Sequence, residues 1–215
     1  MNNALLFLPV LLFSVVLHEY AHAWQARREG DNTAYMLGRV TLNPIPHIDL
    51  FGSILFPAIL IFSNAPFLFG WAKPVPVNPR NYRNYRMGDI RVSLAGIVSN
   101  LILATFCILL FAGFHYAQQA MPDAASAFRT AQMMALQGLG INLVLALFNL
   151  IPIPPLDGSH VLYHMLPPEL GMRYREIGRY GMLILLGLLI FARGAFEIIY
   201  APVYAVLQLV IRLWT

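Results

Sequence analysis

Apolar runs about as long as a bilayer is thick dominate this sequence. They include residues 4–25, 91–114 and 133–152. A helix needs about 20 apolar residues to cross the hydrocarbon core of a membrane. Only 11% of the residues are charged, whereas a typical soluble domain has about 25%. The sequence therefore predicts an all-α polytopic membrane protein with about five to six transmembrane helices.

The apolar segment 48–71 differs from these runs because Pro57, Asn64 and Pro66 interrupt it. It is too short for two full crossings, and basic residues lie on both sides of it, so we expect a re-entrant or interfacial hairpin. Residues 38–43 contain the strand-like sequence Val-Thr-Leu, which predicts a short β-like segment near the functional site. An ordinary cytoplasmic loop is the alternative interpretation of that stretch.

Basic residues are distributed unevenly along the chain. They gather within positions 27–39, 73–91 and 173–179, whereas no Lys or Arg precedes residue 12. Cytoplasmic loops are enriched in Lys and Arg, so the pattern predicts a multi-pass protein of the cell membrane with its N-terminus outside. Membrane topology also accounts for the net charge of +4, and we expect no nucleic-acid partner.

The length of the chain is consistent with one membrane-embedded domain over residues 1–215. We place its core at residues 4–160 and additional C-terminal helices at residues 176–215. Cys107 is the single cysteine and lies within an apolar run, which excludes an intrachain disulfide.

The first apolar run contains a cluster of ionisable residues, HEYAH at positions 18–22. Such residues are costly at membrane depth unless they have partners, which makes them functional candidates. His18 and His22 are four residues apart and therefore lie on one face of a helix, where both imidazoles can bind one metal ion. Glu19 lies beside them and can act as a general base on a water molecule at that metal, as in zincin proteases. The alternative is a structural role, with all three side chains hydrogen-bonded to neighbouring helices.

A catalytic zinc usually has three protein ligands, and membrane depth indicates Asp157 as the third. Asp157 follows the run 133–152, which should end on the same side of the membrane as the histidine pair. Gly158 permits a tight turn at this point. A continued helix is prevented by three prolines, Pro152, Pro154 and Pro155. The prolines and the glycine therefore predict a turn that directs Asp157 back toward the metal.

The remaining histidines are weaker candidates. His160 and His164 are also four residues apart, so a second metal pair is an alternative. They follow the proline break and lie beside a basic cluster, where interfacial histidines are ordinary. His47 and His115 lie further from the site, and His115 is expected at the opposite face of the membrane.

Two of these motifs together resemble the site-2 protease family of intramembrane zinc metalloproteases. That family combines H-E-x-x-H with a distant N-x-x-P-x-x-P-L-D-G segment, which is matched here by NLIPIPPLDG at residues 149–158. A third family feature, G-x-x-x-N, is matched by Gly96 and Asn100, although such small-residue patterns are common in packed membrane helices. The resemblance covers about residues 4–160 and is closest to a compact subgroup that lacks a PDZ domain.

The resemblance implies a zinc protease that acts inside the membrane. His18, His22 and Asp157 would bind one zinc ion. Glu19 would activate the zinc-bound water, and Asn149 would position the scissile segment or stabilise the oxyanion. The substrates would be transmembrane segments of other proteins in the lipid bilayer, cleaved toward the cytoplasmic side.

Two other classes of function are compatible with a metal site in a membrane. A zinc-dependent transporter would often show matching halves with broken helices, and this chain has no such halves. A non-catalytic metal-binding membrane protein, such as a helix binder or chaperone, would have no need of Glu19. Neither alternative explains why a general base, Glu19, lies beside a pair of metal-binding histidines.

Overall fold

The computed structural model describes residues 2–63, 71–191 and 193–214. Within these ranges the chain is helical and contains no strand, which confirms the predicted all-α class. The long helices are α1 (Asn2–Glu29), α4 (Tyr85–Ala120), α5 (Ala125–Asn149) and α9 (Arg193–Trp214). The shorter α-helices are α2 (Thr33–Met36), α3 (Phe56–Phe62), α6 (Gly158–Met165), α7 (Pro168–Ile177) and α8 (Gly181–Phe191). The 3-10 or π segments are η1 (Ile45–His47), η2 (Leu50–Leu55), η3 (Pro79–Asn81), η4 (Pro122–Ala124) and η5 (Gly178–Tyr180).

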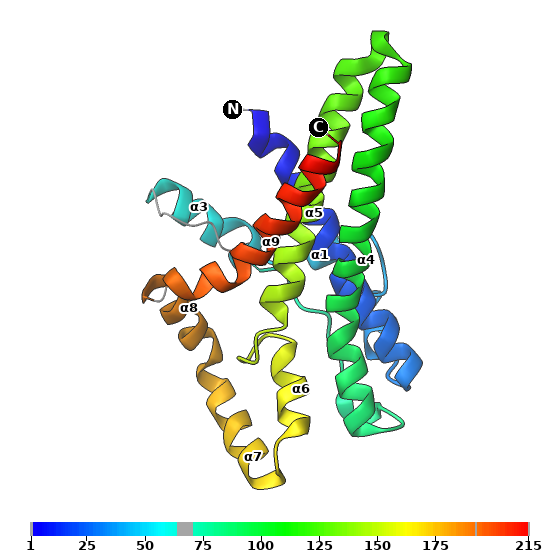
Figure 1. Ribbon diagram of the computed structural model, residues 1–215. Coiled ribbons are helices and arrows are strands. Elements are labelled where there is room, and N and C mark those ends of the chain that lie inside the picture. The colour runs from blue at the N-terminus through cyan, green and yellow to red at the C-terminus, as the bar shows by residue number, and fades with distance from the viewer. Residues whose placement is uncertain (1, 64–70, 192, 215) are drawn as a thin grey trace.

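The centre of the molecule is a long helical hairpin formed by α4 and α5 (Figure 1). α1 crosses this hairpin and contacts both of its helices, while α9 packs mainly against α5. Side chains from α4, α5 and α9 form a buried apolar cluster that consists of Ala104, Phe111, Ala135, Leu139 and Val210. α4 and α5 therefore provide the rigid frame against which α1 is held.

Four helices among the described residues are long and apolar enough to cross a membrane: Phe7–Glu29, Tyr85–Ala120, Pro122–Asn149 and Glu197–Trp214. The prediction of five to six spans is thus confirmed only in part. α8 is strongly apolar but has 11 residues, about half of the length that a crossing requires. Residues 64–70 of the predicted hairpin at 48–71 lie outside the described residues, so the hairpin stays a prediction.

The β-like segment predicted at residues 38–43 is not confirmed. The N–H groups of Gly38 and Arg39 donate to carbonyls of α2 and close the end of that helix. Gly38 has a φ of +66°, which glycine adopts without strain. The Thr41 carbonyl lies 3.0 Å from Nε2 of the His47 ring. Local hydrogen bonds therefore occupy backbone groups that the sequence pattern assigned to a strand.

The segment 71–78 forms no helix or strand; it lies beside α1 and is tied to the end of that helix by the buried Asp31. The carboxylate of Asp31 accepts hydrogen bonds from the Asn78 N–H at 2.7 Å and from Asn81 Nδ2 at 2.8 Å. It also accepts from the Thr33 N–H at 3.1 Å. Burial opposes ionisation, but these hydrogen bonds hold the pKa of Asp31 below its ordinary value.

Members of the three basic clusters lie toward one end of the molecule. Arg27 and Arg28 are at the C-terminal end of α1, Arg86 and Arg91 are in the first turns of α4, and Arg173 and Arg175 are on α7, and these helix parts are all in the lower part of Figure 1. The turn between α4 and α5 lies at the opposite end. The two ends of the helical frame therefore differ in charge.

Candidate metal centre

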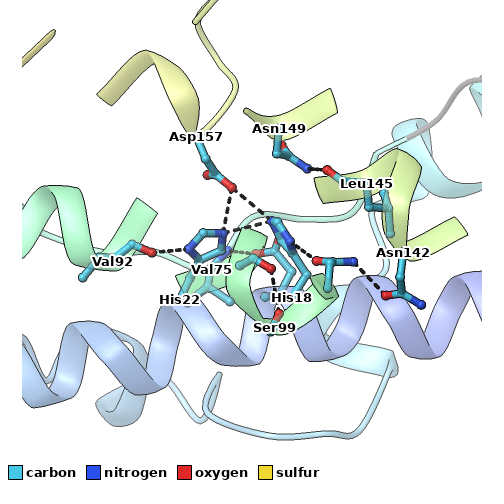
Figure 2. A network of polar contacts seen from close by, with 12 residues as sticks. His18, His22, Val75, Val92, Ser99, Asn142, Leu145, Asn149 and Asp157 are labelled. Carbon is cyan, nitrogen blue, oxygen red and sulfur yellow. Dashed lines mark hydrogen bonds and ion pairs between the residues drawn. The ribbon is translucent and has the colours of Figure 1, made fainter. Parts of the chain in front are cut away.

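Three of the predicted site residues converge in the structure. His18 and His22 project from α1 toward Asp157, which immediately precedes α6 (Figure 2). Asp157 Oδ2 lies 3.3 Å from Nε2 of each histidine, and the two Nε2 atoms are 3.0 Å apart. Among the described residues this is the single group of His, Cys, Asp or Glu side chains arranged to hold a metal ion.

The helix α4 closes over the histidine pair at Gly96. A Cβ atom at this position would stand 2.5 Å from His18 Cε1 and 2.7 Å from His18 Nδ1, and closer still to His22 Nε2. Real Cβ contacts of that length are essentially not observed. A glycine at position 96 is therefore what allows α4 to pack directly against the two imidazoles.

Both imidazoles are oriented through their Nδ1 atoms by partners on α4. His22 Nδ1 lies 2.7 Å from the Val92 carbonyl oxygen, which can only accept a hydrogen bond, so Nδ1 carries the proton. His18 Nδ1 lies 2.6 Å from Asn100 Oδ1. These two hydrogen bonds leave the Nε2 lone pairs of both rings directed at Asp157.

The orientation of Asn100 is itself fixed by a hydrogen-bond chain that ends on backbone carbonyls. Asn100 Nδ2 donates to Asn142 Oδ1 at 2.9 Å, and Asn142 Nδ2 donates to the Gly138 carbonyl at 2.8 Å and to Ser14 Oγ at 2.9 Å. Ser14 Oγ in turn donates to the Val10 carbonyl at 2.8 Å. Carbonyls cannot donate, so the direction of every bond in the chain follows, and His18 must carry its proton on Nδ1.

The chemistry of this cluster fits a cation. With both Nδ1 protons engaged elsewhere, the two Nε2 atoms and the carboxylate oxygen all present lone pairs to one another. Asp157 Oδ2 is buried and has no hydrogen-bond donor, a costly arrangement without a positive charge nearby. Two imidazoles and one carboxylate are a known ligand set of catalytic zinc.

The turn that carries Asp157 depends on a close backbone approach. α5 ends at Asn149, and residues 150–157 form turns before α6 begins at Gly158. A Cβ atom on Gly158 would stand 2.6 Å from the carbonyl carbon of Leu150. The predicted tight turn at Gly158 is therefore present, and it directs Asp157 back toward α1.

Glu19 is adjacent to His18 in the sequence but lies outside the converging group. Its Oε2 accepts a hydrogen bond of 2.8 Å from the Val75 N–H in the segment 71–78. Glu19 precedes His22 by three residues, so the two side chains are neighbours on the surface of α1. This position is suited to a proton-transferring group beside the metal.

Asn149 is the last residue of α5, close to the turn that carries Asp157 (Figure 2). Its Nδ2 donates to the Leu145 carbonyl in the preceding turn at 3.0 Å. The part that Asn149 plays in catalysis stays a prediction.

The alternative histidine ligands lie elsewhere. The ring nitrogens of His160 and His164 contact Asp89 and do not belong to the converging group. His47 is buried beside Thr41, and His115 contacts Gln119 near the far end of α4.

Sequence reasoning missed the hydrogen-bond chain through Asn142 and the contact between Val75 and Glu19. The contact of Asn142 could have been predicted, because an asparagine inside the apolar run 133–152 needs a polar partner. The Val75 contact uses a backbone N–H and therefore leaves no trace in the residue type.

Replacing Asn100 with Leu is expected to weaken zinc binding about 10- to 100-fold, the usual cost of removing a partner that orients a ligating histidine. The apolar side chain cannot accept the Nδ1 proton of His18 or donate to Asn142. Competition with a chromophoric chelator measures the affinity. Gln118→Leu is the control, since this side chain bonds to Gln132 near the far end of α4 and should leave zinc affinity unchanged. Equal affinities of Asn100→Leu and wild type would contradict the orienting role.

Comparison with known proteins identifies the family. The profile described as "Peptidase family M50" matches residues 115–191. "Putative zinc metalloprotease YwhC" of Bacillus subtilis is 40% identical over 189 residues, which are 86% of this chain and 80% of that protein. "Putative zinc metalloprotease Rip2" of Mycolicibacterium smegmatis is 33% identical over 193 residues, which are 88% of this chain and 69% of that protein. No solved structure matches the chain. The chain therefore belongs to peptidase family M50, the site-2 protease family of metalloproteases.

Proposed function

We propose that this protein is an intramembrane zinc endopeptidase that cleaves peptide bonds in or near transmembrane segments of other proteins. One observation carries the proposal: the two ligand histidines and Glu19 lie on α1, and the part of this helix that contains them, Phe7–Glu29, is apolar and long enough to cross a membrane. A soluble protease would have no reason to place its metal ligands in such a helix.

The metal is proposed to be zinc, held by His18, His22 and Asp157. When bound, zinc acts as a Lewis acid that polarises a carbonyl and lowers the pKa of water. The two Nδ1 contacts orient the imidazoles with Nε2 toward Asp157, and the Gly158 turn holds the Asp157 carboxylate opposite them. These contacts fix the site before substrate arrives, which reduces the reorganisation required during the reaction.

Glu19 is proposed as the general base and acid. Its carboxylate would take a proton from the attacking water and pass it to the nitrogen of the leaving amine. The Val75 N–H holds one carboxylate oxygen, which limits the rotamers of the side chain. Asn149 is proposed to position the scissile segment or stabilise the oxyanion. In that case its amide would exchange the Leu145 carbonyl for the substrate.

The proposed surroundings are the lipid bilayer of the cell membrane, with the N-terminus outside and the metal centre toward the cytoplasmic side. The position of members of the three basic clusters toward one end of the helical frame supports this orientation (Figure 1). Transmembrane proteins are the proposed substrates, because a site at membrane depth meets them first. No nucleic-acid partner is proposed.

The proposal is tested with purified protein in proteoliposomes against a panel of model transmembrane substrates. Cleavage should be lost when a chelator removes the metal and should return when zinc, but not magnesium, is added, because the ligand set suits zinc. Mass spectrometry of the products locates the cut relative to the apolar segment. Cleavage that continues in protein shown to contain no zinc would overturn the metal assignment, and a zinc-loaded protein that cuts no panel member would count against the endopeptidase.

A further inference from the structure

Asp89 is a buried carboxylate that lies outside the metal centre, near the start of α4. Its side chain is 3% exposed. Its Oδ2 atom lies 3.2 Å from His160 Nδ1 and 2.8 Å from His164 Nε2. Because the two histidines are four residues apart on α6, one carboxylate oxygen holds two successive turns of that helix. The contact compensates the cost of burying the carboxylate and ties α6 to α4.

The N-terminus of α4 does not require Asp89 as a cap. Asn84 is the N-cap residue, and its Oδ1 accepts a hydrogen bond of 2.9 Å from the Met87 N–H. The carboxylate of Asp89 is therefore available to α6, where it contacts the two histidines.

The position of α6 determines the position of the acid ligand. Asp157 is the N-cap residue of α6, and Gly158 is the first residue of the helix. No flexible linker separates the ligand from the helix, so a shift of α6 relative to α4 moves Asp157 relative to the imidazoles. His160 is only three residues beyond Asp157, so the contact with Asp89 is made within one helical turn of the acid ligand.

The same helix α4 positions the two histidine ligands. Val92 and Asn100 contact the Nδ1 atoms, and Gly96 admits the imidazole rings. Asp89 precedes these three residues at spacings of three, seven and eleven, all of which fall on one face of a helix. One face of α4 therefore contacts the histidine ligands directly and the acid ligand through α6.

We infer that Asp89 is a positioning residue of the metal centre, which holds Asp157 at its ligand position through His160 and His164. The inference rests on the proposed zinc site and does not depend on which substrate is cleaved. Zinc affinity is therefore a readout that separates this inference from the proposed proteolytic activity.

The test compares the zinc affinity of Asp89→Leu and Asp89→Asn in purified protein by chelator competition. Asp89→Leu should bind zinc about tenfold more weakly. This is the lower end of the loss of metal affinity that follows when a residue that orients a metal ligand is removed. Asp89→Asn keeps an acceptor oxygen and should recover most of the affinity. His164→Leu removes the contact from the other side and should reproduce the loss, so the test does not depend on a single variant folding.

Asp31→Leu is the matched control for Asp89→Leu, because Asp31 is also buried and hydrogen-bonded but holds segment 71–78 instead of α6. It should lower the thermal midpoint of unfolding and leave zinc affinity unchanged.

In an Asp157→Ala background, Asp89→Leu should cause no further loss of affinity, because the carboxylate that Asp89 positions is already absent. An equal loss in both backgrounds would show a general loosening of the fold and would overturn the inference. Full affinity in Asp89→Leu, or no zinc binding by the wild type, would also overturn it.

Discussion

Replacing Glu19 with Gln is expected to lower the rate of peptide cleavage about 10²–10⁴-fold, the usual contribution of a positioned proton-transfer group. Glutamine has nearly the same shape and keeps an oxygen that can accept the Val75 N–H, but it cannot take a proton from water. Zinc should stay bound, because Glu19 is outside the group formed by His18, His22 and Asp157. The measurement combines single-turnover cleavage of a model transmembrane substrate with the zinc content of the same preparation.

Glu29→Gln provides the matched control on the same helix. Glu29 is also largely buried on α1, where it accepts a hydrogen bond of 2.7 Å from Gln25 Nε2. Its Oε1 lies 3.5 Å from Arg91 Nη1, so the substitution removes a carboxylate charge from the same helix without touching the metal centre. Cleavage by Glu29→Gln should be unchanged. Cleavage by Glu19→Gln at the wild-type rate would contradict the general-base role, and loss of zinc from that variant would show that Glu19 is needed to hold the metal.

The convergence of His18, His22 and Asp157 was predictable because each residue has a local cause that can be recognised from residue types. The four-residue spacing of His18 and His22 follows from helix geometry alone. The prolines and Gly158 predict a turn, and the predicted topology places this turn at the same membrane depth as the histidines. The structure joins these two local features at Asp157.

The contacts that orient the ligands were less accessible, because they depend on how α4 packs against α1 and α6. Val92 contributes a backbone carbonyl to His22, and no property of valine reveals that contact. Asp89 and His164 are separated by 75 residues along the chain, and only the packing of α6 on α4 brings them together. Only four of the predicted five to six spans are found among the described residues, and α8 there is apolar enough for a crossing but too short for one.

Replacing Gly96 with Ala is expected to weaken zinc binding about 5- to 150-fold, which corresponds to the cost of about 1–3 kcal/mol for an extra methyl group in a packed site. The new Cβ atom would stand 2.5 Å from His18 Cε1 and closer to His22 Nε2, the atom that faces the metal. Neither ring can retreat freely, because Asn100 and Val92 hold the Nδ1 atoms from the same helix. Zinc affinity by chelator competition and the thermal midpoint of unfolding should both fall.

Gly113→Ala separates this steric effect from the general effect of alanine in a helix. Gly113 also lies within α4, but a Cβ atom there would meet nothing within 4 Å. Because glycine in a helix interior is about 0.5–1 kcal/mol less favourable than alanine, Gly113→Ala should slightly raise the thermal midpoint and keep full zinc affinity. The two variants make the same chemical change on one helix, so a loss of zinc affinity in Gly96→Ala alone can only reflect what lies against position 96. Equal zinc affinities in both variants would mean that α4 does not pack against the imidazoles, and the metal centre described here would then have the wrong geometry.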